Sequence, residues 1–214
     1  MIFRDRRDAG RQLALKLGHL KGKDVVVLGI PRGGVVVAEE VAKALGATLD
    51  IVVTKKIEAP GEPEFALGAV TQEGEVLMDR QAAESLGATP EYLDEEIRRK
   101  KEEVKRRIEV LRGGGPYPTL EGKVVVIVDD GIATGSSVTA AVLSVKKRNP
   151  RSVVVAVPVA PSDAVETLSH EGVQVVCLQA PESFLAIGEF YQDFDQVEDI
   201  EVKRILGGDI DARG

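Results

Sequence analysis

Residues 124–137 read VVVIVDDGIATGSS. Five apolar, β-branched residues lead to two adjacent carboxylates, Asp129 and Asp130, and the chain continues through small and hydroxyl-bearing residues. An uninterrupted apolar run is typical of a strand that is covered on both faces. Because ligands of open α/β sheets bind beyond the carboxyl ends of the strands, the two aspartates stand where a binding site is expected.

The rest of the chain repeats this order of strand and helix. Apolar runs predict strands at 25–30, 48–54, 123–128, 152–160 and 173–178. Helical patterns lie between several of them, at 33–46, 136–149 and 161–172. The alternation predicts an α/β fold with a doubly wound, mainly parallel sheet of five strands.

Two segments interrupt the alternation. Residues 90–112 place acids and bases four apart, such as Glu95 with Arg99 and Glu96 with Lys100, around a narrow apolar stripe. This pattern predicts a long solvated helix that lies on the core or on a partner subunit. We expect it within an inserted helical segment at about 80–115 of a core domain spanning 1–180. The aromatic-rich tail, 181–214, is expected to form a small hood in the same domain.

Composition narrows the classes of function. The 214 residues are 43% hydrophobic, which suffices for one sizeable core. The net charge of -7 argues against nucleic acid as a partner. Cys177 is the single cysteine, and no run approaches the roughly 20 apolar residues of a membrane span. These features predict a cytoplasmic protein without a membrane partner, and they leave a homodimer open.

The aspartate pair is poorly arranged for acid/base catalysis, because adjacent residues of an extended chain point to opposite sides. The carboxylates can instead accept hydrogen bonds from neighbouring hydroxyls or touch a hydrated Mg²⁺ ion. The following turn leads into a helix N-terminus, where free N–H groups favour an anion. This loop has no lysine and therefore suits a monophosphate better than the polyphosphate of a Walker A motif. A solvated strand end with a capped helix is the alternative.

A second loop has the chemistry of an anion site. Residues 29–34, GIPRGG, end the first strand and enter a helix. Gly33 and Gly34 permit a close approach of the backbone, Pro31 fixes the turn, and Arg32 offers a fork of donors to phosphate oxygens. Together the two loops suit a ligand with a pyrophosphate, a ribose and a 5-phosphate, which describes 5-phosphoribosyl-1-pyrophosphate (PRPP).

VVIVDDGIATGSS resembles the PRPP-binding signature of type I phosphoribosyltransferases, and GIPRGG is similar to the pyrophosphate loop of that family. The resemblance covers about residues 24 to 178. It implies that Asp129 and Asp130 hold the ribose hydroxyls and approach Mg²⁺ through water. It also implies a non-proline cis peptide at Arg32-Gly33 and a 5-phosphate cradle formed by Ala133, Thr134, Gly135, Ser136 and Ser137.

The resemblance also places a flexible loop over the pyrophosphate. In this chain KKIEAPGEPEFALG (55–68) stands in that position, with Lys55 and Lys56 at its root. The implied pyrophosphate site comprises Pro31, Arg32, Gly33, Gly34, Lys55 and Lys56. Such a lid would exclude water from an oxocarbenium-like transition state.

The acceptor is harder to predict. Phe184, Phe190, Tyr191 and Asp193 of the tail are the candidate acceptor residues, because a planar ring can stack on an aromatic face. Docking of these aromatic residues on the core is an equal alternative. Ala133 stands where the 6-oxopurine enzymes carry Asp, so a purine acceptor is in doubt and no other acceptor is established.

The resemblance implies a Mg²⁺-dependent enzyme of nucleotide salvage. It would transfer 5-phosphoribose from PRPP to a nitrogen acceptor and release pyrophosphate. A nucleobase is the leading candidate for this acceptor. Arg32, Lys55, Asp129 and Asp130 are the catalytic candidates, acting through charge stabilisation and orientation. The alternative is a PRPP-sensing regulator of the same fold that has no transferase activity.

Overall fold

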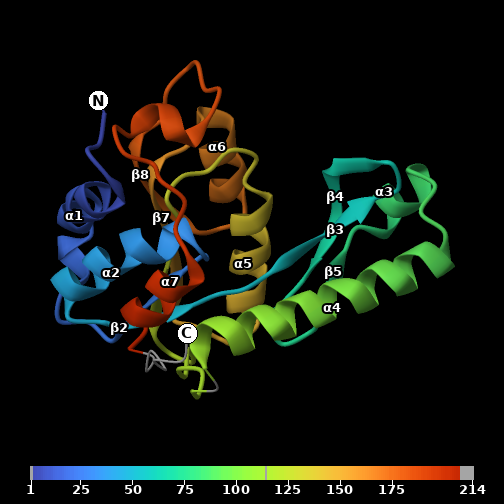
Figure 1. The fold of residues 1–214 in the computed structure, drawn as a ribbon, viewed down its shortest axis with the longest axis horizontal. Helices are drawn as coiled ribbons and strands as arrows, with labels where there is room; N and C mark the ends of the chain where they lie inside the picture. Colours follow the sequence, from blue (N-terminus) through green and yellow to red (C-terminus); the bar gives the residue numbers. More distant parts are fainter. Residues whose placement is uncertain (1, 114, 208–214) are drawn as a thin grey trace.

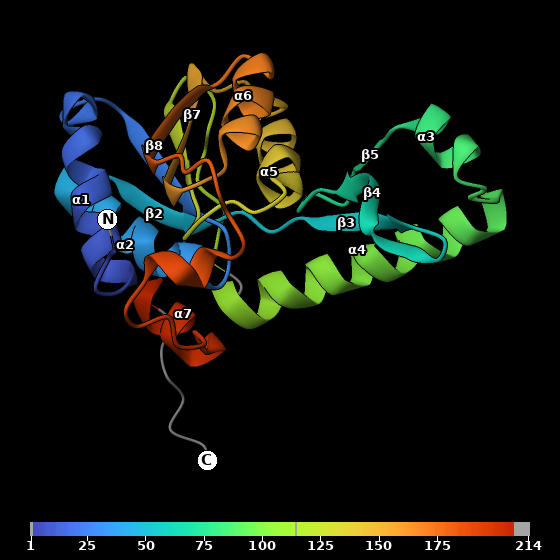
Figure 2. The same cartoon turned by 90° about the horizontal axis from the view of Figure 1, so that it is seen from above.

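Five parallel strands form the central sheet of the molecule, in the order β2-β1-β6-β7-β8 (Figures 1 and 2). Their bounds are β1 (Val25–Gly29), β2 (Thr48–Ile51), β6 (Val124–Val128), β7 (Ser152–Val159) and β8 (Gln174–Gln179). The structure is a computed structural model that describes residues 2–113 and 115–207. The predicted five-stranded parallel sheet is confirmed, with each strand inside or close to its apolar run.

Helices cover both faces of this sheet, as the doubly wound prediction requires (Figure 1). On one face, α1 (Arg6–Lys16) and α2 (Gly33–Leu45) pack on residues such as Val124 and Val126. On the other face, α5 (Ser136–Lys146) and α6 (Ser162–His170) pack on Val125 and Ile127. Successive residues of a strand therefore pack into the two hydrophobic layers on opposite faces of the sheet. This explains why the runs are apolar throughout.

A separate arm extends from the core between β2 and β6 (Figures 1 and 2). It holds an antiparallel sheet of β3 (Lys55–Ala59), β4 (Glu62–Val70) and β5 (Val76–Met78), together with α3 (Arg80–Ser85) and α4 (Pro90–Arg112). The expectation of a flexible loop at 55–68 is wrong, because these residues form β3, a turn at Pro60-Gly61 and most of β4. Ile57 and Ala59 are buried and share a core with Val104 of α4, which keeps the segment in strand form.

The long helix is confirmed at its predicted bounds. The Thr89 side chain accepts a hydrogen bond from the N–H of Tyr92, Pro90 opens the helix, and Gly113 ends it in a left-handed conformation. Lys100 pairs with Glu96 as expected, but Arg99 pairs with Glu96 at 2.6 Å, and Glu95 pairs with Arg98. Residues three apart are also neighbours on a helix, which accounts for this change of partners.

The N-terminal segment and the tail are bound to each other. Phe3 forms a parallel bridge with Tyr191, its N–H donates to the carbonyl of Phe190, and its carbonyl accepts the N–H of Gln192, both at 2.8 Å. The tail then forms η2 (Ile187–Phe190) and α7 (Asp199–Ile205). The predicted hood thus docks on the core up to residue 207, while residues 208–214 lie outside the described residues.

Candidate active site

The candidate site lies between β1 and β6, where the strand order switches: the chain continues from β1 to one edge of the sheet and from β6 to the other. β1 and β6 are neighbours in the middle of the sheet, and Gly29 pairs with Val128. The chain leaves β1 to form α2 on one face and leaves β6 to form α5 on the other. The two loops that follow these strands therefore open a crevice between them, the usual ligand position in such sheets.

Two glycines let the loops approach each other. A Cβ on Gly33 would lie 1.9 Å from Oδ2 of Asp130, and one on Gly34 would lie 2.8 Å from the Cα of Asp129. The structure also has a non-proline cis peptide, but it joins Pro31 to Arg32 and not Arg32 to Gly33. The expected position is therefore wrong by one bond, and Arg32 itself has right-handed helical backbone angles as the N-cap of α2.

The two aspartates have different surroundings. Oδ2 of Asp130 accepts a hydrogen bond of 2.7 Å from Nε of Arg6, and the backbone carbonyl of Asp130 accepts one of 2.6 Å from the Tyr191 hydroxyl. Oδ1 of Asp129 accepts the N–H of Asp130 at 2.9 Å. The pKa of Asp129 is raised well above its ordinary value, first by burial and then by the neighbouring carboxylate of Asp130. A cation or a set of hydroxyl donors near Asp129 would offset this cost.

Arg6 is a neighbour of the candidate site that the sequence patterns did not indicate. Its guanidinium lies 3.8 Å from the centre of the Phe194 ring, and its NH1 group donates to the carbonyl of Asp195 at 2.8 Å. The Arg6 and Asp130 side chains are only 11% and 14% exposed. Because 124 positions separate the two residues, no local motif could have linked them. Arg6 orients Asp130 and joins it to the tail.

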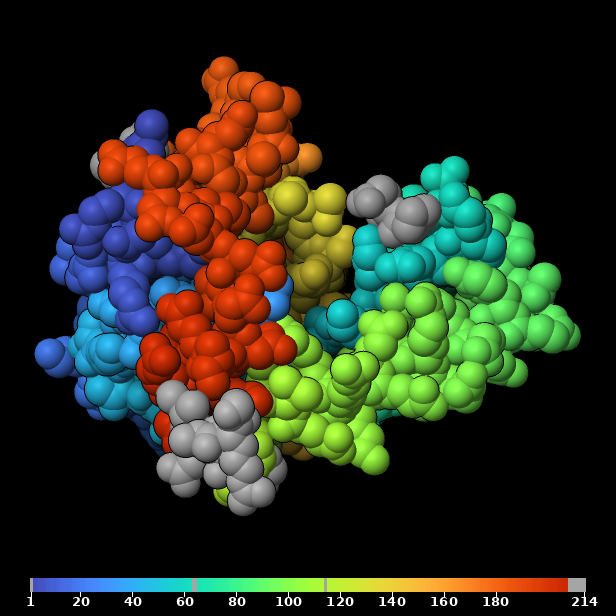
Figure 3. All heavy atoms as spheres, viewed as in Figure 1, coloured from blue at the N-terminus to red at the C-terminus, as the bar shows by residue number. Residues whose placement is uncertain are grey.

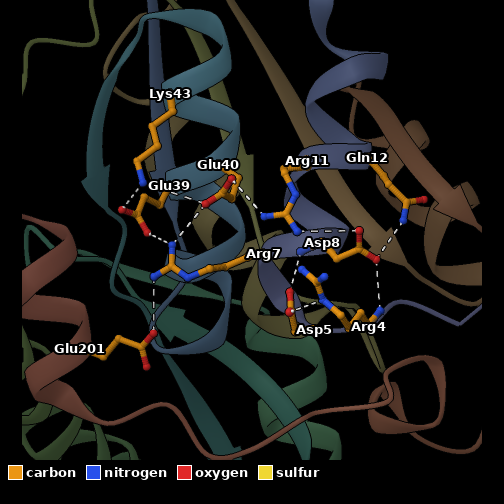
Figure 4. A network of polar contacts seen from close by, with 10 residues as sticks. All are labelled: Arg4, Asp5, Arg7, Asp8, Arg11, Gln12, Glu39, Glu40, Lys43 and Glu201. Atoms are coloured by element: carbon orange, nitrogen blue, oxygen red, sulfur yellow. Dashed lines mark hydrogen bonds and ion pairs between the residues drawn. The ribbon is translucent and has the colours of Figure 1, made fainter.

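The adjacent Arg7 fixes the helix that carries Arg6 (Figure 4). Arg7 contacts Glu39 and Glu40 on α2, and its NH2 group lies 3.7 Å from Glu201 on α7. Lys43 pairs in turn with Glu39 at 2.6 Å. This network links α1, α2 and α7, and it therefore holds the Arg6 side chain at the crevice.

Substitution of Arg6 by Met is expected to destabilise the fold by about 2–4 kcal/mol, because it leaves the mostly buried Asp130 carboxylate without its cation. Chemical denaturation would measure the change. Arg4→Met is the matched control, since Arg4 pairs with Asp5 at the surface and its side chain is 67% exposed. Equal, small effects of both substitutions would contradict the role of Arg6.

The predicted phosphate cradle forms a small cavity of about 180 Å³. It is lined by Asp129, by the residues from Gly131 to Val138, and by Ile187 of the tail. Gly135 has a left-handed backbone (φ 80°) directly before α5, and the hydroxyls of Thr134 and Ser136 lie 3.2 Å apart. The loop therefore presents a helix N-terminus and hydroxyl groups to one small volume, as an anion requires.

A larger cavity of about 660 Å³ adjoins the first loop. Its charged lining consists of five cationic side chains and one carboxylate, namely Arg32, Lys55, Lys56, Lys100, Arg107 and Glu58. Pro31 and Ser137 also line it, so it borders the phosphate cradle. The structure brings Arg32, Lys55 and Lys56 together, and it adds two cations from α4 that sequence reasoning had assigned to a solvated face.

The candidate acceptor residues are less clearly arranged. Phe184 and Phe190 stack on each other with ring centres 5.6 Å apart. Tyr191 is buried between Phe3 and Phe194, so its ring is a docking contact and offers no free face here. Asp193 donates its N–H to the carbonyl of Arg4.

A further groove, of about 540 Å³, separates the arm from α5 (Figure 3).

The chain belongs to the phosphoribosyl transferase family: the family model described as "Phosphoribosyl transferase domain" matches residues 5–195. Two relatives from Mycobacterium tuberculosis, "Putative phosphoribosyl transferase MT0597" and "Putative phosphoribosyl transferase Rv0571c", are each 43% identical over 205 residues. The match covers 96% of this chain but 46% of each relative, so the chain spans about half of their length.

A crystal structure of the protein TT1426 from Thermus thermophilus is similar over nearly the whole chain. The identity is 48%, the TM-score is 0.87, and the alignment covers 96% of this chain and 98% of that one. Together with the family match, this similarity confirms the predicted phosphoribosyltransferase-like α/β fold. Within residues 2–113 and 115–207, no helix combines the length and the apolar character needed to cross a bilayer.

Proposed function

We propose that the chain transfers 5-phosphoribose from PRPP to a nitrogen acceptor, with a nucleobase as the first class to test, and releases pyrophosphate. The observation that supports this most strongly is the meeting of three subsites at one crevice. A cationic cavity, an aspartate pair and a small hydroxyl-lined cradle follow two adjacent central strands. They correspond in chemistry and order to the pyrophosphate, the ribose and the 5-phosphate of PRPP.

The proposed roles follow from charge and position. Arg32 and Lys55, with Pro31, Gly33, Gly34 and Lys56 around them, would bind the pyrophosphate as it departs from the anomeric carbon with its bonding electrons. Asp129 and Asp130 would accept hydrogen bonds from the ribose hydroxyls and so orient that carbon toward the acceptor nitrogen. Residues 133–137 would hold the 5-phosphate. Phe184 and Phe190 remain the proposed contacts of the acceptor.

Mg²⁺ is part of the proposal, and the donor set fits it. The described residues contain no cluster of three or more His, Cys, Asp or Glu side chains arranged to hold a metal. Two adjacent carboxylates suit an ion that keeps most of its water ligands and also contacts substrate oxygens. When bound there, Mg²⁺ would offset the charge that develops on pyrophosphate. Asp129, whose charged form is disfavoured in the protein alone, is the first candidate to face it.

The direct test is release of pyrophosphate from PRPP with Mg²⁺ across a panel of purine and pyrimidine bases. We expect turnover with at least one base, and no release beyond slow hydrolysis without a base. Asp130→Asn and Arg32→Ala are both expected to lose affinity for PRPP, and unchanged binding in both would contradict the site assignment. Tight PRPP binding without turnover on any acceptor would contradict the transferase and favour a PRPP-sensing regulator.

A further inference from the structure

The inserted arm contributes to the large cationic cavity as well as extending from the core. Lys100, Val104, Arg107 and Leu111 lie on one face of α4, because they are spaced three or four residues apart. Val104 and Leu111 are almost fully buried, at 2% and 1% exposure. Arg107 lies between them on this inner face and lines the cavity together with Arg32. Arg106, the residue directly before Arg107 in the chain, is exposed.

The carboxylate of Asp199 forms ion pairs with both arginines of the cavity, Arg32 and Arg107. Asp199 begins α7, and its Oδ1 and Oδ2 atoms lie 2.8 and 2.9 Å from NH1 of Arg107. The same Oδ1 lies 3.7 Å from NH1 of Arg32, and Glu198 is 3.9 Å from that group. Arg32, Arg107 and Asp199 are each about one third exposed, at 32%, 27% and 35%, so a ligand can reach all three. The two guanidinium groups therefore converge on a single anionic group.

We propose that Arg107 is a second arginine of the pyrophosphate subsite, contributed by the inserted arm, and that pyrophosphate replaces Asp199 between Arg107 and Arg32. This inference rests on the proposed function. A guanidinium group binds phosphate oxygens through two parallel hydrogen bonds, and two such groups match the two phosphates of the ligand. Asp199 then acts as a competitor of the ligand, because the same cations cannot be fully paired with both.

A purely structural role for Arg107 makes the opposite prediction for Asp199. If the Arg107–Asp199 pair only fastened α4 to α7, removal of either charge would loosen the cavity and weaken every ligand there. If the pair is exchanged for pyrophosphate, removal of Asp199 strengthens binding while removal of Arg107 weakens it. The sign of the Asp199 effect therefore separates the two roles.

The experiment is calorimetric titration of the full chain with two probes, inorganic pyrophosphate and ribose 5-phosphate, each in the presence of Mg²⁺. Arg107→Met keeps the apolar stem and is expected to weaken pyrophosphate binding roughly 10- to 100-fold, the range for lost hydrogen bonds to a charged group. Arg107→Lys should recover part of the loss, since it restores the charge without the fork. Ribose 5-phosphate should bind all these variants like the unaltered chain, which also verifies that they are folded.

Arg106→Met is the matched control, because it removes the same group from the same helix on the exposed side. It should leave both affinities unchanged. Asp199→Asn should tighten pyrophosphate binding several-fold. Pyrophosphate binding that is equal in Arg107→Met and Arg106→Met, or weaker in Asp199→Asn, would overturn the role of Arg107 and leave the proposed function standing. Failure of the unaltered chain to bind both pyrophosphate and ribose 5-phosphate would overturn both.

Discussion

Asp129→Asn is expected to make the protein more stable and less able to bind PRPP. The substitution removes a negative charge whose burial beside the Asp130 carboxylate already disfavours the ionised form. The same charge is proposed to hold a ribose hydroxyl and to face Mg²⁺. Loss of about 2–3 kcal/mol of binding free energy would weaken PRPP roughly 30- to 150-fold. Thermal denaturation and titration with Mg²⁺ and PRPP measure the two effects separately.

Asp24→Asn provides the control for this change. Asp24 precedes β1 at the opposite end of the sheet, pairs with Lys123 at 3.3 Å, and has a side chain that is 71% exposed. Its replacement should alter neither the melting temperature nor the affinity for PRPP by a measurable amount. A fall in stability for Asp129→Asn, or an affinity for PRPP equal to that of the control, would contradict the assignment of Asp129.

Gly34→Ala is expected to disable the site although it adds a single methyl group. The new Cβ would lie 2.8 Å from the carbonyl oxygen of Val128 and from the Cα of Asp129, both of which are backbone atoms. The N-terminus of α2 would have to move, at a cost of about 1–3 kcal/mol. This cost exceeds the gain of about 0.5–1 kcal/mol that alanine usually brings to a helix. A shift of this loop should lower the rate of transfer on the order of 100-fold.

The comparison variant is Gly18→Ala. A Cβ at Gly18 would meet no atom within 4 Å, so this change should leave stability and PRPP turnover as they were. Stability is read from chemical denaturation and activity from release of pyrophosphate. If Gly34→Ala were as stable and as active as Gly18→Ala, the two loops would not depend on their close approach.

The strands and the two loops of the site could be predicted because their signals are local. Each buried strand is an apolar run. The acidic, hydroxyl-bearing, basic and glycine residues that follow Val128 and Gly29 indicate a ligand-binding site by their residue types alone. The arm sheet also had a local signal, since buried Ile57 and Ala59 alternate with more exposed neighbours. The family resemblance instead predicts a lid loop at 55–68, and this expectation conflicts with β3 and β4.

Arg6 and Arg107 could not be assigned in the same way. Arg6 reaches Asp130 across 124 positions of the chain, and the packing of α1 against α2 helps to bring them together. Arg107 lies in a helix whose bases alternate with acids, so the pattern indicates a solvated face. The apolar stripe of α4 shows which side of the helix is buried. It does not show which element that side packs against, because this depends on the tertiary structure.

The pairing of β1 with β6 also controls the geometry of the crevice. Gly29 stands opposite Val128, so both loops leave the sheet at the same height. Sliding β6 by two residues would keep every side chain on its own face of the sheet, yet it would carry the aspartates about 7 Å along the strand. The ribose and pyrophosphate subsites would then no longer meet one substrate. An insertion or deletion within β1 or β6 is therefore expected to separate the two loops even where every residue of the loops is kept.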